Sequence, residues 1–183
     1  GLLTKANMDT LAGLGYTYII GARAKSEKTI IKNEILSLQL NDGETKVIHK
    51  TDGNRLIISY SEKRAKKDEH NRKRGLNRLE KQVKSGKLTK QNINNKGYNK
   101  YLRMKGKVEI EIDYDKYNAD KRWDGLKGYI TNTTLSPSTI LEQYKNLWHI
   151  EKAFRMSKSD LRIRPIYHRL KKRIEAHICL SFA

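Results

Sequence analysis

Apolar residues recur at two different spacings along the first part of the chain. Residues 3–14 place them at helical intervals, and a β-branched and aromatic run follows at 16–20 after two glycines. Residues 26–38 return to helical spacing behind Ser26, which is typical of a capped amphipathic helix. A helix, a buried strand and a second helix in succession predict an α/β fold.

The next segments have the sequence pattern of a β-hairpin. Residues 45–49 and 55–60 have strand character, and Asp52, Gly53 and Asn54 between them form a strong turn signal. We interpret this hairpin as an inserted β element.

The segments after the hairpin alternate between basic helix, loop and strand. Residues 61–84 predict a long helix with few apolar positions, and residues 87–105, which are rich in Asn and Lys, predict a loop. Alternating apolar and charged residues at 107–113 favour a half-solvated strand, followed by a short helix or turn to Asp120. A second buried strand is predicted at 128–132.

Helical spacing dominates the remainder of the chain. A helix starts near Pro137 and continues without a breaker to about residue 160. Arg164 and Pro165 interrupt the pattern, and residues 167–182 predict a final helix.

The positive charge of the chain indicates a polyanion as its binding partner. The 183 residues hold 39 Lys and Arg against 20 Asp and Glu, a net charge of +19. Residues 61–84 carry ten basic and four acidic side chains, and residues 145–173 carry ten and two. The excess is therefore concentrated in two helical segments.

Several classes of protein are set aside by composition. Cys179 is the single cysteine, which leaves no disulfide framework, zinc cluster or iron–sulfur site. No apolar run is long enough for a membrane span and no secretion signal opens the chain, so a cytoplasmic location is the default. The chain starts without Met and ends in an apolar run, so we expect a part of a longer polypeptide.

One helix combines an acid with aromatic and basic residues at regular spacing. Tyr144, Glu151 and Lys158 are seven residues apart, so that in a continuous helix they share one face with a drift of about 20° per step. A structural interpretation stays open here. Trp148, Ile150 and Phe154 suit a buried core, and Glu151 with Arg155 suits an ordinary i,i+4 ion pair.

These residues carry a resemblance to a known family. The order Tyr144-x2-Leu147-x3-Glu151-x6-Lys158 resembles, at three of four positions, the Y-(2)-R-(3)-E-(6)-K signature of bacterial insertion-sequence transposases of the DDE superfamily. Leu147 stands where the family often has Arg. The phosphate contact of that Arg would then pass to a neighbouring cation, either Lys145, Lys152 or Arg155.

Three separate blocks resemble the family in the family's own order. Residues 144–168 are similar to its C-terminal catalytic helix, residues 1–23 to the segment after its second catalytic Asp, and residues 123–133 to the strand before the final helix. The resemblance implies a partial RNase H-like α/β fold, a mixed sheet with flanking helices that is interrupted by a largely β insertion with a long basic helix. Residues 1–40 and 122–183 would be parts of the catalytic domain, and 41–121 the insertion subdomain.

The resemblance also implies the chemistry. Glu151 would be the third catalytic acid and a ligand of Mg²⁺ (or Mn²⁺), together with two Asp residues upstream of Gly1. Asp9, Asp113, Asp115 and Asp120 are expected to be surface charges, and Asp124 a turn residue before Gly125. The 183-residue piece would therefore have no strand-cleaving activity alone.

Double-stranded DNA, as transposon ends and target, is the implied partner, bound by a homodimer in the synaptic complex. Tyr144 and Lys158 would contact phosphates, Arg155, Arg162 and Arg164 would extend the basic surface, and Trp123 would stack on an extruded base. From the residues alone, Trp123 suits a core or loop anchor better than a base contact. Arg162, Arg164 and the helix at 61–84 equally suit solvated faces. The alternative function is a basic nucleic-acid-binding module without chemistry.

Overall fold

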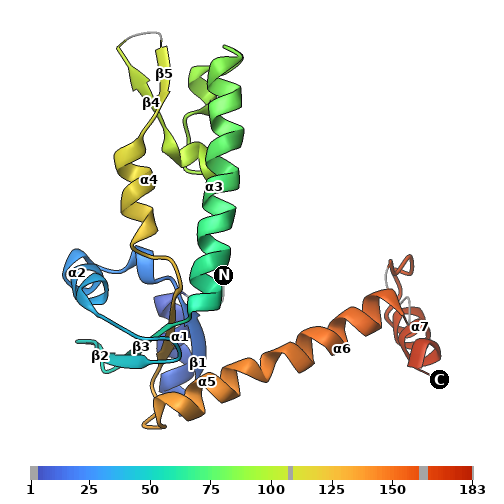
Figure 1. Cartoon of the computed structure of the whole chain (residues 1–183). Helices are drawn as coiled ribbons and strands as arrows, with labels where there is room; N and C mark the ends of the chain where they lie inside the picture. The colour runs from blue at the N-terminus through green and yellow to red at the C-terminus, as the bar shows by residue number, and fades with distance from the viewer. Residues whose placement is uncertain (1–3, 107–108, 161–164, 183) are drawn as a thin grey trace. The chain divides into compact units, whose positions relative to one another are not determined.

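The computed structural model describes residues 4–106, 109–160 and 165–182 of the chain. The chain divides into two compact units, Gly1–Thr133 and Thr134–Ala183, and each is described by itself (Figure 1). The predicted positions 107–108 and 161–164, which include Arg162 and Arg164, lie outside the described residues.

A four-stranded antiparallel sheet forms the base of the first unit. Its order is β1-β6-β3-β2, where the strands are β1 (Ile19–Ala22), β6 (Leu126–Thr131), β3 (Arg55–Tyr60) and β2 (Thr45–His49). Both strands of the predicted hairpin are confirmed to the residue. β3 is an inner strand with a partner on each side, and the side chains of Leu56, Ile57 and Ile58 are fully buried.

The predicted strand at 16–20 begins later, at Ile19. The preceding backbone is held by side chains instead of a strand ladder. Thr131 donates its hydroxyl to the carbonyl of Tyr18 (2.6 Å), and the Asn132 amide accepts from the Tyr18 N–H (2.9 Å) and donates to the Tyr16 carbonyl (3.0 Å). These bonds satisfy the backbone without extending the sheet.

Two helices flank the start of the sheet. They are α1 (Lys5–Gly13), capped by Thr4, and α2 (Thr29–Ser37), whose Ile35 is fully buried in the sheet core. The predicted Ser26 cap is wrong. Ser26 ends the short 3₁₀ turn η1 (Ala24–Ser26), and the extended backbone at Glu27 and Lys28 delays α2 to Thr29.

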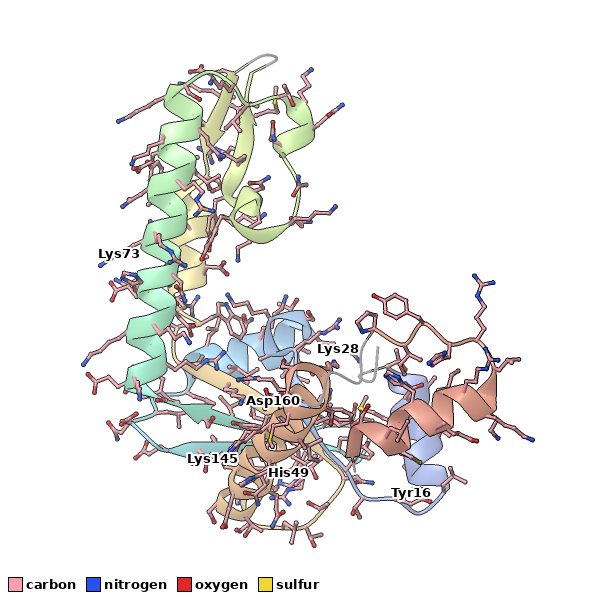
Figure 2. All side chains as sticks on the ribbon, turned by 90° about the vertical axis from the view of Figure 1, so that its right-hand side faces the viewer. Tyr16, Lys28, His49, Lys73, Lys145 and Asp160 are labelled. Carbon is pink, nitrogen blue, oxygen red and sulfur yellow. The ribbon has the colours of Figure 1, made fainter. Side chains whose placement is uncertain are left out.

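A long helix and a hairpin build an arm above this sheet (Figure 1). The predicted basic helix is confirmed as α3 (Glu62–Lys84), whose first N–H is accepted by the Asp42 carboxylate at 2.8 Å. Beside it lie β4 (Leu102–Lys105), β5 (Glu109–Ile112) and α4 (Tyr114–Lys121). In Figure 2 many α3 side chains, that of Lys73 among them, point away from the β4–β5 hairpin.

The arm has a small core of its own. Leu79 of α3 packs with Tyr101, Leu102 and Ile112, all four buried. The loop predicted for 87–105 is therefore wrong in part, because the segment contains η2 (Lys90–Asn92), η3 (Gly97–Tyr101) and strand β4. Leu102 pairs with Ile112 in the hairpin register, a contact that the composition of the segment does not reveal.

The regular elements in the described part of the second unit are all helices. It contains α5 (Pro137–Lys145), α6 (Leu147–Ser159) and α7 (Lys171–Phe182). Pro137 occupies the first turn of α5, which confirms the predicted helix start. The structure adds the cap, because Ser136 accepts from the Thr139 N–H at 3.2 Å. The final helix begins at Lys171 instead of residue 167.

The observed fold is α/β with helices and antiparallel sheets. Every described strand pair is antiparallel, and the predicted hairpin belongs to the same sheet as β1 and β6. The RNase H-like topology and the subdomain boundaries at 40/41 and 121/122 stay predictions.

Candidate nucleic-acid interface

The helix predicted to carry chemistry is built as two helical segments joined at Asn146. Asn146 keeps right-handed helical angles (φ −64°, ψ −16°), and its N–H is shared between the carbonyls of Glu142 and Gln143, each at 3.2 Å. The His149 N–H then bonds back to the Asn146 carbonyl at 3.0 Å, an i→i−3 bond typical of a tightened turn. Tyr144 therefore lies on α5, whereas Glu151 and Lys158 lie on α6.

Glu151 lines a shallow groove on α6 together with two cationic side chains. The groove is formed by Glu151, Phe154, Arg155, Lys158 and Ser159. The structure thus brings together three of the predicted site residues, one acid and two bases.

The expected ion pair between Glu151 and Arg155 does not form. Within the described residues no basic nitrogen lies within 4.0 Å of the Glu151 carboxylate, although the spacing i,i+4 would allow it. The carboxylate is exposed and its charge is not neutralised by a neighbouring cation. Such a carboxylate is free to meet a ligand from outside the helix.

The aromatic and aliphatic side of the same helix is not a core. Trp148 is 51% exposed and Phe154 is 62% exposed, and Ile150 is exposed as well, because α6 buries none of its described residues. The structural interpretation of these three residues as core is therefore wrong for this chain. Lys152 covers one of them in part, with its Nζ 5.8 Å from the centre of the Trp148 ring.

Trp123 lies at the foot of β6 in the first unit. It is half-buried, packs against the sheet core and has the Lys25 Nζ 5.8 Å from its ring centre. This placement is that of an anchor for the turn before β6. A contact between this ring and a base stays a prediction.

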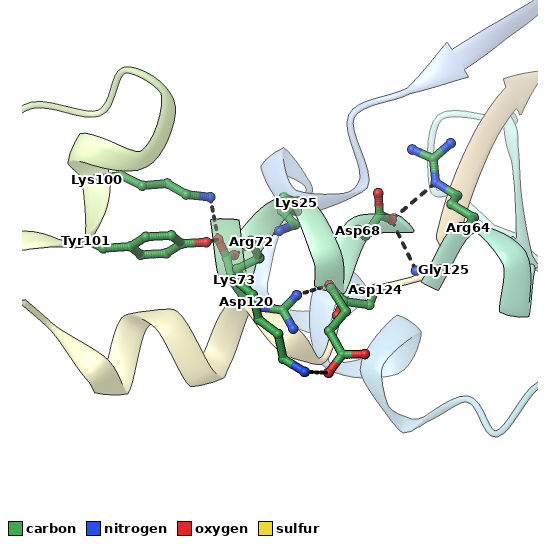
Figure 3. A network of polar contacts seen from close by, with 11 residues as sticks. Lys25, Arg64, Asp68, Arg72, Lys73, Lys100, Tyr101, Asp120, Asp124 and Gly125 are labelled. Atoms are coloured by element: carbon green, nitrogen blue, oxygen red, sulfur yellow. Dashed lines mark hydrogen bonds and ion pairs between the residues drawn. The ribbon is translucent and has the colours of Figure 1, made fainter. Parts of the chain in front are cut away.

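Asp120 is the centre of a polar network that joins three separate segments (Figure 3). Its carboxylate accepts from Lys25 of η1 (2.8 Å) and from the Tyr101 hydroxyl (2.7 Å), and it pairs with Lys100 of η3. Only 19% of the side chain is exposed. The prediction that Asp120 is a surface charge is wrong, because its partners come from distant parts of the sequence.

The network shifts the acidity of its members. Burial alone would raise the pKa of the Asp120 carboxyl, but the hydrogen bonds from Lys100, Lys25 and Tyr101 outweigh it and lower the pKa to about 2. Burial and the bond to Asp120 together raise the pKa of the Tyr101 phenol above its usual range. Asp120 is therefore ionised at neutral pH and bound to its cations.

A second buried ion pair fixes the arm to the turn before β6. Arg72 of α3 is 6% exposed, pairs with Asp124 and lies over the Tyr117 ring at 5.3 Å. Gly125 follows with φ +78°, and a Cβ there would meet the Ser61 carbonyl oxygen at 2.8 Å. The turn predicted at Asp124 and Gly125 is confirmed, and the structure adds the arginine that the sequence alone does not connect to it.

The described residues contain no cluster of three or more metal-ligating side chains. Within them no three His, Cys, Asp or Glu side chains lie close enough together to hold an ion. No described helix is both long and apolar enough to cross a membrane.

The comparison with protein families decides the identity. The family model described as the transposase DDE domain matches residues 1–183. The chain belongs to the transposase DDE domain family. Searches of curated proteins and of solved structures found no match to it.

Family membership confirms part of the expectation drawn from the sequence. The family consists of transposases, enzymes whose activity is transposition and whose partner is DNA. The match does not extend to the signature subgroup, the bacterial origin or the roles of individual residues, which stay predictions.

Sequence reasoning missed residues that connect this transposase domain across long distances. Arg72 is one of ten basic residues in its segment, and nothing in the local pattern sets it apart. Its position in the sequence, three residues before Gly75 and seven before Leu79 on the packed face of α3, is the signal that could have placed it inside.

Proposed function

We propose that this chain is the part of a DDE transposase that carries the third catalytic acid and grips transposon-end DNA during cleavage and joining. The observation that carries the proposal is the α6 groove, where the unpaired carboxylate of Glu151 lies beside Arg155 and Lys158. The family match over the whole chain supports it. A bacterial insertion sequence, acting in the cytoplasm on nucleoid DNA, would be its setting.

Each cation of the groove suits a phosphate oxygen. The guanidinium of Arg155 and the ammonium of Lys158 would form charge-assisted hydrogen bonds with the DNA backbone, and the Tyr144 hydroxyl would donate a further one. Such contacts position the duplex but read no sequence. Arg162 and Arg164 would extend this surface, and Trp123 would stack on a base drawn out of the duplex.

Glu151 would supply one oxygen ligand to Mg²⁺ or Mn²⁺, ions that prefer carboxylates. When bound, a metal pair stabilises the attacking and leaving oxygens of a phosphodiester exchange. The described residues supply no cluster of three ligands, so further carboxylates must come from elsewhere in the transposase. We therefore expect no strand cleavage from these 183 residues alone.

The test uses a full-length transposase that contains this segment. Glu151→Gln should abolish Mg²⁺-dependent nicking of a labelled transposon-end duplex by at least about 100-fold, with end binding in a gel-shift assay unchanged. Glu142→Gln is the matched control, because Glu142 is an exposed acid on α5 outside the groove. Nicking by Glu151→Gln at the rate of the control would remove Glu151 from the metal site.

The same assay distinguishes a transposase from the alternative function, a basic nucleic-acid-binding module without chemistry. A binding module without chemistry would shift the duplex but nick it in neither Mg²⁺ nor Mn²⁺, whichever residue stood at 151. Mass photometry of the end complex should show two copies of the chain, since we propose a homodimer in the synaptic complex.

A further inference from the structure

Helix α3 has one face packed and the opposite face fully in solvent. The packed face contains Arg72, Gly75 and Leu79, which are buried at intervals of three and four residues. At 100° per residue, the direction opposite to this face passes close to residues 63, 70, 77 and 81. The two sides of α3 are thus set by the sequence and by the arm core.

The solvent side contains a row of cations without a single acid. We call it the α3 basic row, and all its members are exposed: Lys63, Lys67, Arg74, Arg78 and Lys81. They fall within about 60° of arc around the helix and extend over about 27 Å. Arg74, Arg78 and Lys81 of the row line a shallow groove together with His70, Asn77 and Lys73, and the charge of Lys73 is paired with Glu69.

Two cations on the flank of α3 are neutralised, but those of the row are not. Lys66 bonds to Glu62 at 2.8 Å and Lys73 to Glu69 at 2.7 Å, each an i,i+4 pair on the flank of the helix. In the portion of the chain that the structure describes, no carboxylate lies within 4.0 Å of any member of the row. The four acids of α3 all lie away from it, at residues 62, 68, 69 and 80.

The row is unfavourable for the helix by itself. Lys63 and Lys67, and likewise Arg74 and Arg78, are like charges at i,i+4, a spacing that destabilises a helix. A face that is only solvated could carry alternating acids and bases, as the flank of α3 does, without this repulsion. A ligand that carries many negative charges removes the repulsion.

We propose that the α3 basic row is a second DNA-contacting surface, which binds the phosphate backbone of a duplex independently of the Glu151 helix. Along about 27 Å one strand of B-DNA presents roughly eight phosphates, more than enough to meet five cations. That the polyanion is duplex DNA rests on the proposed function. The row has no apolar member, whereas a helix that lies on a lipid surface needs an apolar face.

Two double variants with identical chemistry test the row. K67Q/K81Q removes two charges from the row, and K66Q/K73Q removes two charges of the same type from the paired flank of the same helix. Binding of the 183-residue chain to a 30-base-pair duplex of arbitrary sequence is followed by fluorescence anisotropy in EDTA from 0.05 to 0.2 M salt. Circular dichroism checks that both variants remain helical.

The expected result is specific to position. K67Q/K81Q should reduce the slope of log Kobs against log salt by about 2, which corresponds to a roughly 60-fold weaker complex at 0.1 M salt. K66Q/K73Q should change the slope by less than about 0.5. Equal slopes for the two variants would overturn the proposal, because net charge alone would then explain the binding.

Competition by RNA tests whether DNA is the ligand of the row. If an RNA duplex of the same length competes more than tenfold better than DNA, the assignment of DNA as the ligand of the row is wrong. EDTA excludes metal-dependent cleavage, so failure of the row and failure of Glu151 as a catalytic acid give different results in separate assays.

Discussion

The Asp120 network allows a quantitative prediction, because one carboxylate joins η1, η3 and α4. Replacing Asp120 with Asn keeps the shape of the side chain but removes the charge that pairs with Lys25 and Lys100. The fall in the pKa of Asp120 from 3.8 to about 2 corresponds to about 2 kcal/mol of the free energy of unfolding at pH 7. We expect Asp120→Asn to lower that free energy by this amount.

The pH dependence fixes the sign of the effect. Because the folded state lowers the pKa of Asp120, its contribution is complete above the unfolded-state pKa of 3.8 and is lost as the pH falls toward 2. The difference between wild type and Asp120→Asn should therefore shrink to about 1 kcal/mol at pH 3.

Urea unfolding read by tryptophan fluorescence measures the difference locally. The chain has two tryptophans, and in a Trp148→Phe background only Trp123, three residues after Asp120, reports. Asp115→Asn is the matched control, because the Asp115 side chain is 96% exposed and should change stability by less than about 0.5 kcal/mol. A difference between wild type and Asp120→Asn that stays the same from pH 7 to pH 3 would refute the reasoning.

Two further predictions, each with a control substitution, concern the turn at Gly125 and the cation Lys158. Gly125→Ala should lower the free energy of unfolding by about 2–4 kcal/mol in urea titrations, because the residue has φ +78° and a Cβ would meet the Ser61 carbonyl. Gly53→Ala, with the same φ and open space around it, should lose only about 1 kcal/mol, and equal losses would contradict the packing argument. In end-binding assays Lys158→Ala should make the salt dependence shallower by about 1 in slope, whereas Lys171→Ala should leave it unchanged.

Local signals predicted the elements that depend on neighbours in sequence. The hairpin at 45–49 and 55–60 follows from a turn signal between two β-rich runs, and the structure has both strands at those residues. The helix from 62 to 84 follows from a run rich in Lys, Arg and Glu that contains no proline and ends before Gly86. The helix start at Pro137 likewise needs no long-range information.

The sequence pattern could not predict contacts between residues that are far apart in the sequence. Asp120 looks like any acid in a polar segment, yet its partner Lys25 lies 95 residues away. Strand β4 is hidden in an Asn-rich segment because its identity comes from pairing with β5. Periodicity also misled in one place, since the apolar spacing of Trp148 and Phe154 predicts burial, but both are exposed.

The inner position of β3 constrains how this family can vary in length. If residues 41–121 were deleted, β6 would keep only β1 as a neighbour, and a two-stranded ribbon is marginally stable in water. Relatives with a shorter insertion should therefore retain the 45–60 hairpin and lose residues from the arm. In an alignment of such relatives, gaps should gather between residues 85 and 106 and spare residues 55–60, which complete the sheet from within the predicted insertion.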